Sequence, residues 1–128
     1  MTDQDQNLAA VVNTTQGSYR VIVGRGVVDD LGHELKKIGL QGRAFLIADY
    51  VMFPNPVRRA QEALERGGYE THVLSLEISE SNKNLETVQI VYEWLADLRA
   101  ERRDIVVAMG GGVTGDLVGF AAATWLRG

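Results

Sequence analysis

The sequence predicts an α/β fold, with a Rossmann-like parallel sheet flanked by helices and preceded by a β-hairpin. Residues 44–48 and 104–109 are short, largely apolar runs, which are typical of strands buried on both faces of a parallel sheet. Segments with helical spacing of apolar residues separate the strand-like runs and are long enough to connect parallel strands. Two β-prone runs at the start of the chain are close enough to pair as a hairpin.

The first elements follow from a change in hydrophobic period. We expect the hairpin from residues 8–13 and 19–23, with residues 14–18 as the connection. Apolar residues then recur at helical spacing until Gly39, a residue type that commonly follows the end of a helix. The apolar positions of this predicted helix are Val28, Leu31, Leu35 and Ile38.

The predicted strand at residues 44–48 leads to a second helix. Asn55 is expected as its N-cap and Pro56 as its first helical residue. Gly67 and Gly68 end the helix, and residues 69–76 return to β character. The buried stripe of this helix is expected to consist of Val57, Ala60, Ala63 and Leu64.

A polar connection at residues 77–84 precedes a third helix, and the strand at residues 104–109 precedes a fourth that reaches about Leu126. This last helix has almost no polar face, so we expect it to be buried all round in a complete protein. A chain that exposes part of it should self-associate. The apolar stripe of the third helix is expected to contain Leu85, Val88, Val91, Leu95 and Leu98.

Composition excludes several classes of function. The 128 residues carry a formal charge of −4, which argues against a nucleic-acid binder. The chain has no Cys, and its two histidines, His33 and His72, are far apart, so no metal site is expected within it. No apolar run is long enough to span a membrane, and the polar start lacks the features of a secretory signal. A cytoplasmic location is therefore expected.

The clearest functional motif is the glycine-rich loop at residues 110–115. It matches G-x-G-x-x-G, follows a predicted strand and begins a predicted helix. Backbone N–H groups at such a helix start can bind a phosphate or diphosphate. The alternative is that these glycines serve only a tight turn and close packing. The loop also follows a late strand rather than the first, unlike the usual dinucleotide fingerprint.

Other polar residues have both a binding and an ordinary structural interpretation. Asp49 ends a predicted strand, where it could accept ribose hydroxyls or cap a turn. Asp116 lies near a helix start, and Glu80 with Lys83 could be a solvated pair. Arg127 could cap a helix or bind an anion.

Four segments of the sequence resemble a known family. Residues 104–128, with the run Met-Gly-Gly-Gly-Val-Thr-Gly-Asp, closely resemble the glycine-loop segment of 3-dehydroquinate synthases. Residues 79–87 resemble the Gly-Glu-x-x-Lys stretch of that family and the helix start after it, and residues 19–26 and 46–49 are similar to its first and second strand regions. The resemblance implies that residues 1–128 form an NAD-binding N-terminal domain, incomplete at its C-terminal end. The family's helical C-terminal domain, which carries zinc or cobalt, is absent.

The same resemblance implies an activity. The family converts the sugar phosphate 3-deoxy-arabino-heptulosonate 7-phosphate to 3-dehydroquinate, a lyase reaction that eliminates phosphate in the shikimate pathway of aromatic amino acid biosynthesis. A homodimer is also implied, with no nucleic-acid or membrane partner. We expect the 128-residue chain alone to be inactive, because no catalytic residue or metal ligand of the family maps onto it.

Site residues carry over one at a time. The resemblance implies that Asp49, Glu80 and Lys83 hold the adenosine ribose and that Asp116 holds the nicotinamide ribose. It implies that Arg127 reaches the substrate phosphate of the neighbouring subunit. The residues implied to bind the diphosphate are Gly111, Gly112, Val113, Thr114 and Gly115.

Departures from the family pattern leave alternatives open. Ser79 stands where a Gly is usual, Asn82 stands where an aromatic residue is usual, and residues 50–55 differ from the common run. One alternative is a related sugar-phosphate cyclase that makes a valiolone or inosose ring. Others are a metal-dependent alcohol or glycerol dehydrogenase and a non-catalytic nucleotide-binding module.

Overall fold

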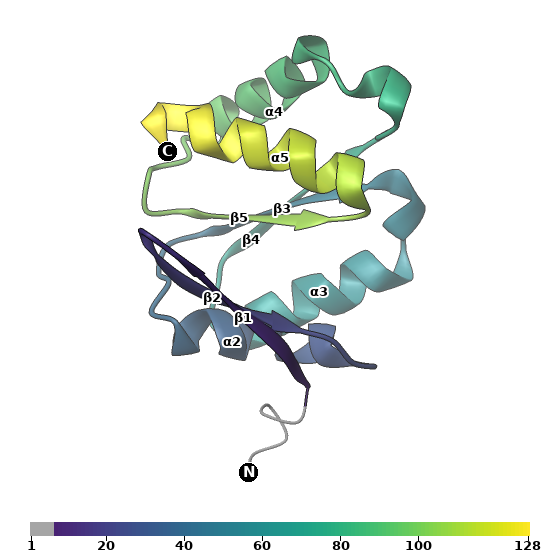
Figure 1. Cartoon of the computed structure of the whole chain (residues 1–128). Helices are drawn as coiled ribbons and strands as arrows, with labels where there is room; N and C mark the ends of the chain where they lie inside the picture. Colours follow the sequence, from purple (N-terminus) through teal and green to yellow (C-terminus); the bar gives the residue numbers. More distant parts are fainter. Residues whose placement is uncertain (1–6) are drawn as a thin grey trace.

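A computed structural model describes residues 7–128 as a three-layer α/β unit with a separate hairpin (Figure 1). The polar start of the chain, used above against a secretory signal, lies mostly outside the described residues. Helices α2 and α3 lie on one side of a three-stranded sheet, and α4 and α5 lie on the other (Figure 1). The main elements are β1 Leu8–Thr14, β2 Gly17–Ile22, α2 Leu31–Lys37, β3 Ala44–Asp49, α3 Asn55–Arg66, β4 Thr71–Leu76, α4 Leu85–Asp97, β5 Ile105–Met109 and α5 Gly112–Thr124.

The parallel sheet has the order β4-β3-β5, with β3 in the centre. Ala44 pairs with Thr71 on β4 and with Ile105 on β5, and both pairings are parallel. Residues 44–48 are completely buried because successive side chains of β3 enter two different cores. Phe45 and Ile47 pack toward α4 and α5, whereas the residues between and beside them pack toward α3. The prediction of a strand buried on both faces is confirmed here.

The last strand is a partial exception. β5 forms where the apolar run predicts it, but it is not buried on both faces. Ile105 is buried and Ala108 is exposed, because β5 is an edge strand of the described sheet. An apolar run therefore predicted the strand correctly and its burial incorrectly.

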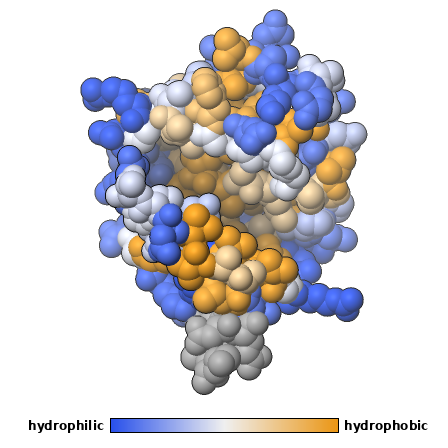
Figure 2. Space-filling view, in the orientation of Figure 1, coloured by the Kyte–Doolittle hydropathy of each residue, from blue (hydrophilic) through white to orange (hydrophobic). Residues whose placement is uncertain are grey.

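The hairpin forms with a shorter connection than predicted. Strands β1 and β2 pair as far as Thr14 and Gly17, which leaves only residues 15–16 in the turn. The predicted connection at 14–18 was too long because the polar residues at its ends join the strands. An ion pair between Arg20 and Glu34 at 3.1 Å ties the hairpin to α2. Figure 2 shows hydrophobic residues gathered over the hairpin on this face of the molecule.

Three predicted helices begin or end differently. The first is divided into a 3₁₀ turn, Val27–Asp30, and the short α2, so Ile38 lies beyond it and is exposed. α3 begins at Asn55 after Pro54, so Asn55 is not its N-cap. α5 ends at Thr124 and is followed by a 3₁₀ turn, Trp125–Arg127.

For α4, the helical spacing of apolar residues predicted more burial than the structure shows. Leu85, predicted in the apolar stripe of α4, is 74% exposed because it is the first residue of the helix. Phe120 on α5 is 49% exposed, so this chain leaves part of its last helix uncovered, which is the case in which self-association is expected. Among residues 7–128, no helix combines the length and apolarity needed to cross a membrane.

Candidate nucleotide site

Most of the predicted site residues lie on segments that follow the carboxyl ends of the three parallel strands. Strands β3, β4 and β5 run in parallel and end at Asp49, Leu76 and Met109 (Figure 1). The segments that follow contain Asp49 itself, residues 77–84 and the glycine loop at 110–115. The carboxyl edge of an open α/β sheet is the usual place for a ligand. Most of the predicted binding residues are therefore brought to this edge by topology.

Gly110, the first residue of the loop, is required by packing. A Cβ atom placed on it would lie 2.2 Å from the Oγ1 atom of Thr114, which is itself 1% exposed. Any side chain at position 110 would have to displace this buried threonine. The structural interpretation of the motif, a turn that allows close packing, therefore holds for Gly110.

Gly111, Gly112 and Gly115 differ from Gly110 in the space around them. A Cβ atom on any of the three would meet no other atom within 4 Å. Packing inside the chain therefore does not explain why these positions lack side chains. Open space beside a glycine backbone is what close approach of a ligand requires. The described geometry fits a diphosphate cradle at these positions.

The start of α5 adds donors to this cradle. Gly111 occupies the N-cap position, and no side chain accepts a hydrogen bond from the first turn. No acidic residue lies in that turn. The free N–H groups and the positive end of the helix dipole are therefore available to an anion.

Lys83 and Asp116 form an ion pair across the site. The Nζ atom of Lys83 donates to Oδ2 of Asp116 at 3.0 Å, and the two side chains are 41% and 65% exposed. This contact raises the pKa of Lys83, mainly through the hydrogen bond to Asp116. No pattern in the sequence predicted the pair. The solvated pair between Glu80 and Lys83, considered above, is not formed as an ion pair.

Asp49 and Glu80 are placed on neighbouring loops. The Oδ1 atom of Asp49 accepts from the N–H of Val51 at 3.4 Å, so this carboxylate does cap a turn as its structural interpretation expects. Among the described residues, no group donates to its Oδ2 atom. Glu80 is exposed and begins a 3₁₀ turn, Glu80–Asn82. Both carboxylates have oxygens open to solvent, as acceptors for ligand hydroxyls must.

A groove of about 330 Å³ lies beside the ion pair, between the start of α4 and the outer face of α5. Sequence reasoning missed this groove, since Leu85 was assigned to an apolar stripe and is instead exposed at its wall, as Phe120 is. Its lining residues are Lys83, Asn84, Leu85, Val88, Asp116, Leu117 and Phe120.

Arg127 does not join the other predicted site residues. It lies beyond the C-terminal end of α5, whereas the glycine loop lies at the N-terminal end (Figure 1). A helix of 13 residues separates the two by roughly 20 Å. Its backbone is left-handed, with φ of 67°, and the side chain has no hydrogen-bond partner among the described residues.

No metal centre is formed by residues 7–128, because no three His, Asp or Glu side chains come together. His33 is on α2, and His72 is on β4, where its ring stacks on Phe45 at 5.4 Å. Neither histidine lies at the carboxyl edge of the sheet. The side chains described here therefore do not fit a zinc or cobalt ion.

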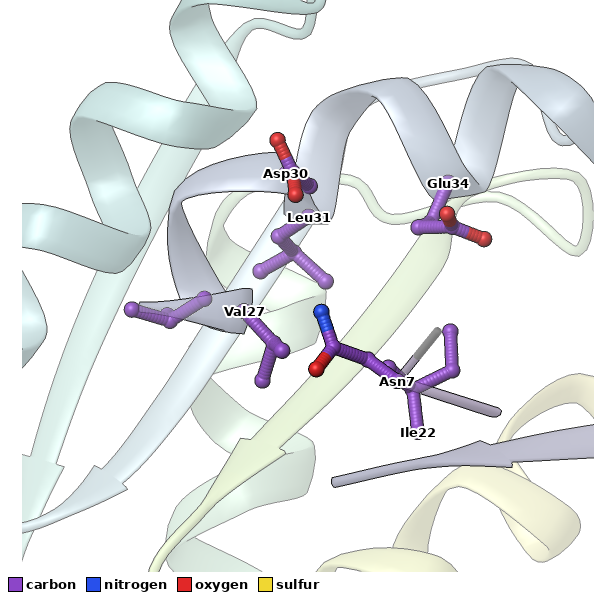
Figure 3. Close-up of a pocket in the computed structure, with 7 residues that line it drawn as sticks. Asn7, Ile22, Val27, Asp30, Leu31 and Glu34 are labelled. Atoms are coloured by element: carbon purple, nitrogen blue, oxygen red, sulfur yellow. The ribbon is translucent and has the colours of Figure 1, made fainter. Parts of the chain in front are cut away.

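A second hollow of about 260 Å³ lies between the hairpin and the segment that leads into α2 (Figure 3). Ile22, Val27 and Leu31 give it apolar walls, and its polar rim includes Asn7 and Glu34. It is on the α2 and α3 side of the sheet, away from the glycine loop, and no predicted site residue lines it.

Sequence comparisons place the chain beside one family. Residues 73–128 match the family model described as 3-dehydroquinate synthase N-terminal. The 3-dehydroquinate synthase of Clostridium kluyveri is 34% identical over 117 residues, which cover 91% of this chain and 33% of the relative. That of Prochlorococcus marinus is 36% identical over 124 residues, which cover 95% of this chain and 34% of the relative. The chain spans about a third of the length of these relatives.

Solved structures agree with this. A 2-deoxy-scyllo-inosose synthase superposes with a TM-score of 0.83 at 26% identity, covering 93% of this chain and 33% of the other. A 2-deoxy-scyllo-inosose synthase complexed with carbaglucose-6-phosphate, NAD+ and Co2+ gives a TM-score of 0.80 at 27% identity, covering 93% of this chain and 32% of the other. A 2-epi-5-epi-valiolone synthase from Streptomyces hygroscopicus, with NAD+ and Zn2+ bound, gives 0.71 at 27% identity, covering 92% and 32%.

Sequence and fold therefore lead to the same assignment: residues 73–128 match the N-terminal region of the 3-dehydroquinate synthase family, and the chain as a whole is similar to about one third of such a synthase.

Proposed function

We propose that the chain binds NAD at the carboxyl edge of its sheet, as the cofactor-binding domain of a 3-dehydroquinate synthase. The observation that carries the proposal is the open space at Gly111 and Gly112, directly at the uncapped start of α5. Glycines that packing does not require, beside free helix N–H groups, are suited to a diphosphate. Residues 1–128 constitute this domain in the proposal.

Each predicted residue then has a role in holding the cofactor. The N–H groups of the loop and first turn donate to the diphosphate, and the residues concerned are Gly111, Gly112, Val113, Thr114 and Gly115. Asp49 and Glu80, with carboxylates on neighbouring loops, accept from hydroxyls of the adenosine ribose, and Lys83 donates to the same ribose. Asp116 accepts from the nicotinamide ribose at the other end of the cradle, beside the groove.

The proposed reaction is the lyase reaction of the family, in which 3-deoxy-arabino-heptulosonate 7-phosphate is cyclised to 3-dehydroquinate with elimination of phosphate. When bound, NAD would supply a hydride acceptor for the carbon that bears a substrate hydroxyl, and it would return the hydride later in the same turnover. The residues of this chain bind and orient the cofactor, and none described is assigned a proton-transfer step. A zinc or cobalt ion would be held by side chains outside this chain.

Assembly and location belong to the same proposal. Arg127 lies roughly 20 Å from the glycine loop, so it does not serve the site of its own chain. In a homodimer, its guanidinium group would bind the substrate phosphate of the neighbouring subunit, where charge and fork geometry suit a phosphate. We propose a cytoplasmic enzyme, since the family's role is biosynthetic.

A second candidate is a cyclase of the inosose or valiolone type. Its support is the superposition on the inosose synthase at a TM-score of 0.83, together with the departures at Ser79 and Asn82. Both candidates use the same cofactor site, so they differ in substrate rather than in what this chain does. A dehydrogenase of the alcohol or glycerol type retains fold-level support only, from a butanol dehydrogenase at 24% identity.

Calorimetric titration with NAD tests the cofactor site. We expect saturable binding by the 128-residue chain and a loss of about tenfold in affinity for Asp116→Asn, because one ribose acceptor is weakened. The control is Asp97→Asn, an exposed change at the far end of α4. Absence of NAD binding by the unaltered chain would contradict the proposal.

A chimera separates an enzyme domain from a non-catalytic module. The 128 residues would replace the matching third of the Clostridium kluyveri enzyme, and phosphate release would be measured. We expect NAD-dependent release from the chimera and none from the chain alone. Release by the chain alone would contradict the division of roles, and a folded, NAD-binding but inactive chimera would favour the non-catalytic module.

A further inference from the structure

A hollow lined mainly by charged side chains lies on the α2 and α3 side of the sheet, and no predicted site residue lines it. Its volume is about 330 Å³, and it opens where α2 crosses the C-terminal end of α3 (Figure 1). α3 runs back from the carboxyl edge of the parallel sheet, so this end of the helix lies at the amino edge, away from the glycine loop. The lining residues are Asp29, His33, Lys36, Ala63, Arg66 and Gly67.

The floor of this hollow is rigid. Gly32 of α2 packs against Gly67 at the end of α3, and a Cβ atom on Gly67 would lie 2.9 Å from the carbonyl carbon of Gly32. His33 and Lys36 are three positions apart on α2, so they share one face of that helix. Arg66 is the last residue of α3 and lines the same hollow from the other helix. Two helices in close contact therefore hold three basic side chains around one space.

The carboxylate in the lining is already neutralised. Arg59 donates to the carboxylate of Asp29 from Nη2 at 2.9 Å and from Nε at 3.3 Å. The hydrogen bond from Arg59 lowers the pKa of Asp29, so the carboxylate is held in its ionised form. Arg66 donates instead to the backbone carbonyl oxygen of Asp29, at 3.1 Å. The ammonium group of Lys36 lies 4.4 Å from the centre of the Tyr69 ring.

Other carboxylates of the two helices do not cancel the remaining charge. Within residues 7–128, neither Lys36 nor Arg66 forms an ion pair with a carboxylate. Glu34 on α2 is already paired with Arg20 at 3.1 Å, and the two glutamates of α3 do not line the hollow. With Asp29 balanced, two permanent positive charges remain beside an exposed imidazole. The space therefore favours an anion.

We propose that this hollow binds a phosphate group, held by Lys36 and Arg66 with His33 as a further donor. The fork of an arginine matches the geometry of phosphate oxygens, and a lysine adds a compact positive charge. A volume of about 330 Å³ is at the lower end of the range for small-molecule pockets, which suits inorganic phosphate or a small phosphate monoester. The proposal does not depend on NAD binding, because this hollow and the glycine loop are at opposite edges of the sheet.

Both cations also have an ordinary structural interpretation. Lys36 lies in the last turn of α2 and Arg66 in the last turn of α3, where positive charges suit the helix dipole. That interpretation predicts an effect of each residue on stability and none on phosphate binding. It does not require the two side chains to line one hollow. Binding measurements therefore distinguish the two interpretations.

Titration of the 128-residue chain with sodium phosphate at a constant pH of 7, followed by NMR, tests the proposal. The chain has two histidines, so the imidazole signals of His33 report on the hollow and those of His72 serve as an internal reference. Sodium chloride at matched ionic strength is the second titrant. We expect phosphate to shift the His33 signals saturably and to leave the His72 signals unchanged. Chloride should produce no saturable shift.

Charge-removing variants identify the residues that hold the anion. Lys36→Gln should weaken phosphate binding about fivefold, because it removes one of the two permanent charges. Arg66→Gln should weaken it to a similar degree. Lys37→Gln is the matched control, because it removes the same charge from the next residue of α2, which does not line the hollow. We expect that control to change the affinity by less than about twofold. Melting temperatures show whether each variant stays folded.

Several results would overturn the proposal. Equal weakening by Lys36→Gln and Lys37→Gln would show that phosphate responds only to net charge. A saturable shift with chloride, or none with phosphate, would show that the hollow does not select this anion. A lower melting temperature of Lys36→Gln with unchanged affinity would leave only the helix-dipole interpretation.

A second probe, glycerol 3-phosphate, distinguishes two sources of the phosphate group. Tighter binding than that of inorganic phosphate would identify a phosphate monoester as the ligand of the hollow. Equal or weaker binding would identify free phosphate. Either result supports a phosphate site, provided that Lys36→Gln weakens it and Lys37→Gln does not.

Discussion

Gly32 and Gly67 touch backbone to backbone where α2 crosses the end of α3. A Cβ atom on Gly32 would lie 2.3 Å from the carbonyl oxygen of Ala63 and 2.9 Å from the Cα atom of Gly67. A Cβ atom on Gly67 would lie 2.7 Å from the Cα atom of Gly32. This crossing places Leu31 and Leu35 against the hydrophobic core between β3 and α3.

Gly32→Ala should therefore destabilise the chain. The added methyl group meets backbone atoms that cannot rotate away, so we expect the free energy of unfolding to fall by about 1–3 kcal/mol. Gly119→Ala on α5 is the matched control, because its Cβ atom would meet nothing within 4 Å. That variant should gain about 0.5–1 kcal/mol from helix propensity. Urea unfolding measures both, and equal effects would contradict the crossing.

Predictions from the sequence were correct where a local pattern of residues determines the structure. The alternation of strands and helices predicted the parallel topology, and that topology alone brings Asp49 and the glycine loop to one edge. Predictions were wrong or missing where burial or a contact depends on residues that are distant in the sequence. Spacing counted Leu85 and Ile38 among the apolar positions of helices, but residues 7–128 leave most of both side chains uncovered. The pair between Lys83 and Asp116 joins residues 33 positions apart, and no periodicity predicts such a contact.

Asp104 provides a test of pH dependence. Its carboxylate accepts from the N–H groups of Glu101 at 2.7 Å and Arg43 at 2.9 Å, and the side chain is 5% exposed. Burial alone would raise the pKa of Asp104, but these hydrogen bonds and the charge of Arg43 outweigh it and lower the pKa. A lowered pKa in the folded state means that the charged form contributes stability above the unfolded pKa, near 3.9.

Asp104→Asn should therefore lower the free energy of unfolding by about 1–3 kcal/mol at pH 7, because an amide cannot accept both N–H groups. The difference from the unaltered chain should shrink as the pH falls below about 4, toward the lowered pKa of the folded state, because Asp104 of the unfolded chain takes up a proton there before that of the folded chain. Urea unfolding at pH 7 and pH 3 measures this. A difference that is constant with pH would show that the charge of Asp104 is not responsible.

Two substitutions in the glycine loop should have separate effects, one on folding stability and the other on NAD binding. Gly110→Ala places a methyl group against the buried Thr114, so we expect a loss of about 1–3 kcal/mol in unfolding free energy. Gly111→Ala meets open space, and its φ of −89° suits any residue, so folding should be unchanged. Its methyl group would occupy room meant for the diphosphate, and NAD affinity should fall about tenfold, or about 1.4 kcal/mol. Unchanged affinity would contradict the cradle.

The N-cap of α4 should be worth a measurable part of the stability. The Oδ1 atom of Asn84 accepts from the N–H of Thr87 at 3.0 Å and from its hydroxyl at 3.1 Å. Asn84→Ala removes both acceptors, so we expect a loss of about 1 kcal/mol. Asn84→Asp keeps an acceptor and should retain most of the stability. Thermal unfolding of the two variants measures this, and equal losses would show that the side-chain acceptor is not the source of the stability.

Exposed apolar side chains at the groove should make the chain self-associate. Leu85 and Phe120 are 74% and 49% exposed on its walls. Burying them against a second surface removes apolar area from water, a gain of about 25 cal/mol per Å². We expect the apparent mass in sedimentation equilibrium to rise with concentration and Phe120→Gln to reduce that rise. Tyr19→Gln, a change on the hairpin at a residue that is 59% exposed, tests the other apolar surface. Association that depends on Tyr19 and not on Phe120 would place the contact on the hairpin instead.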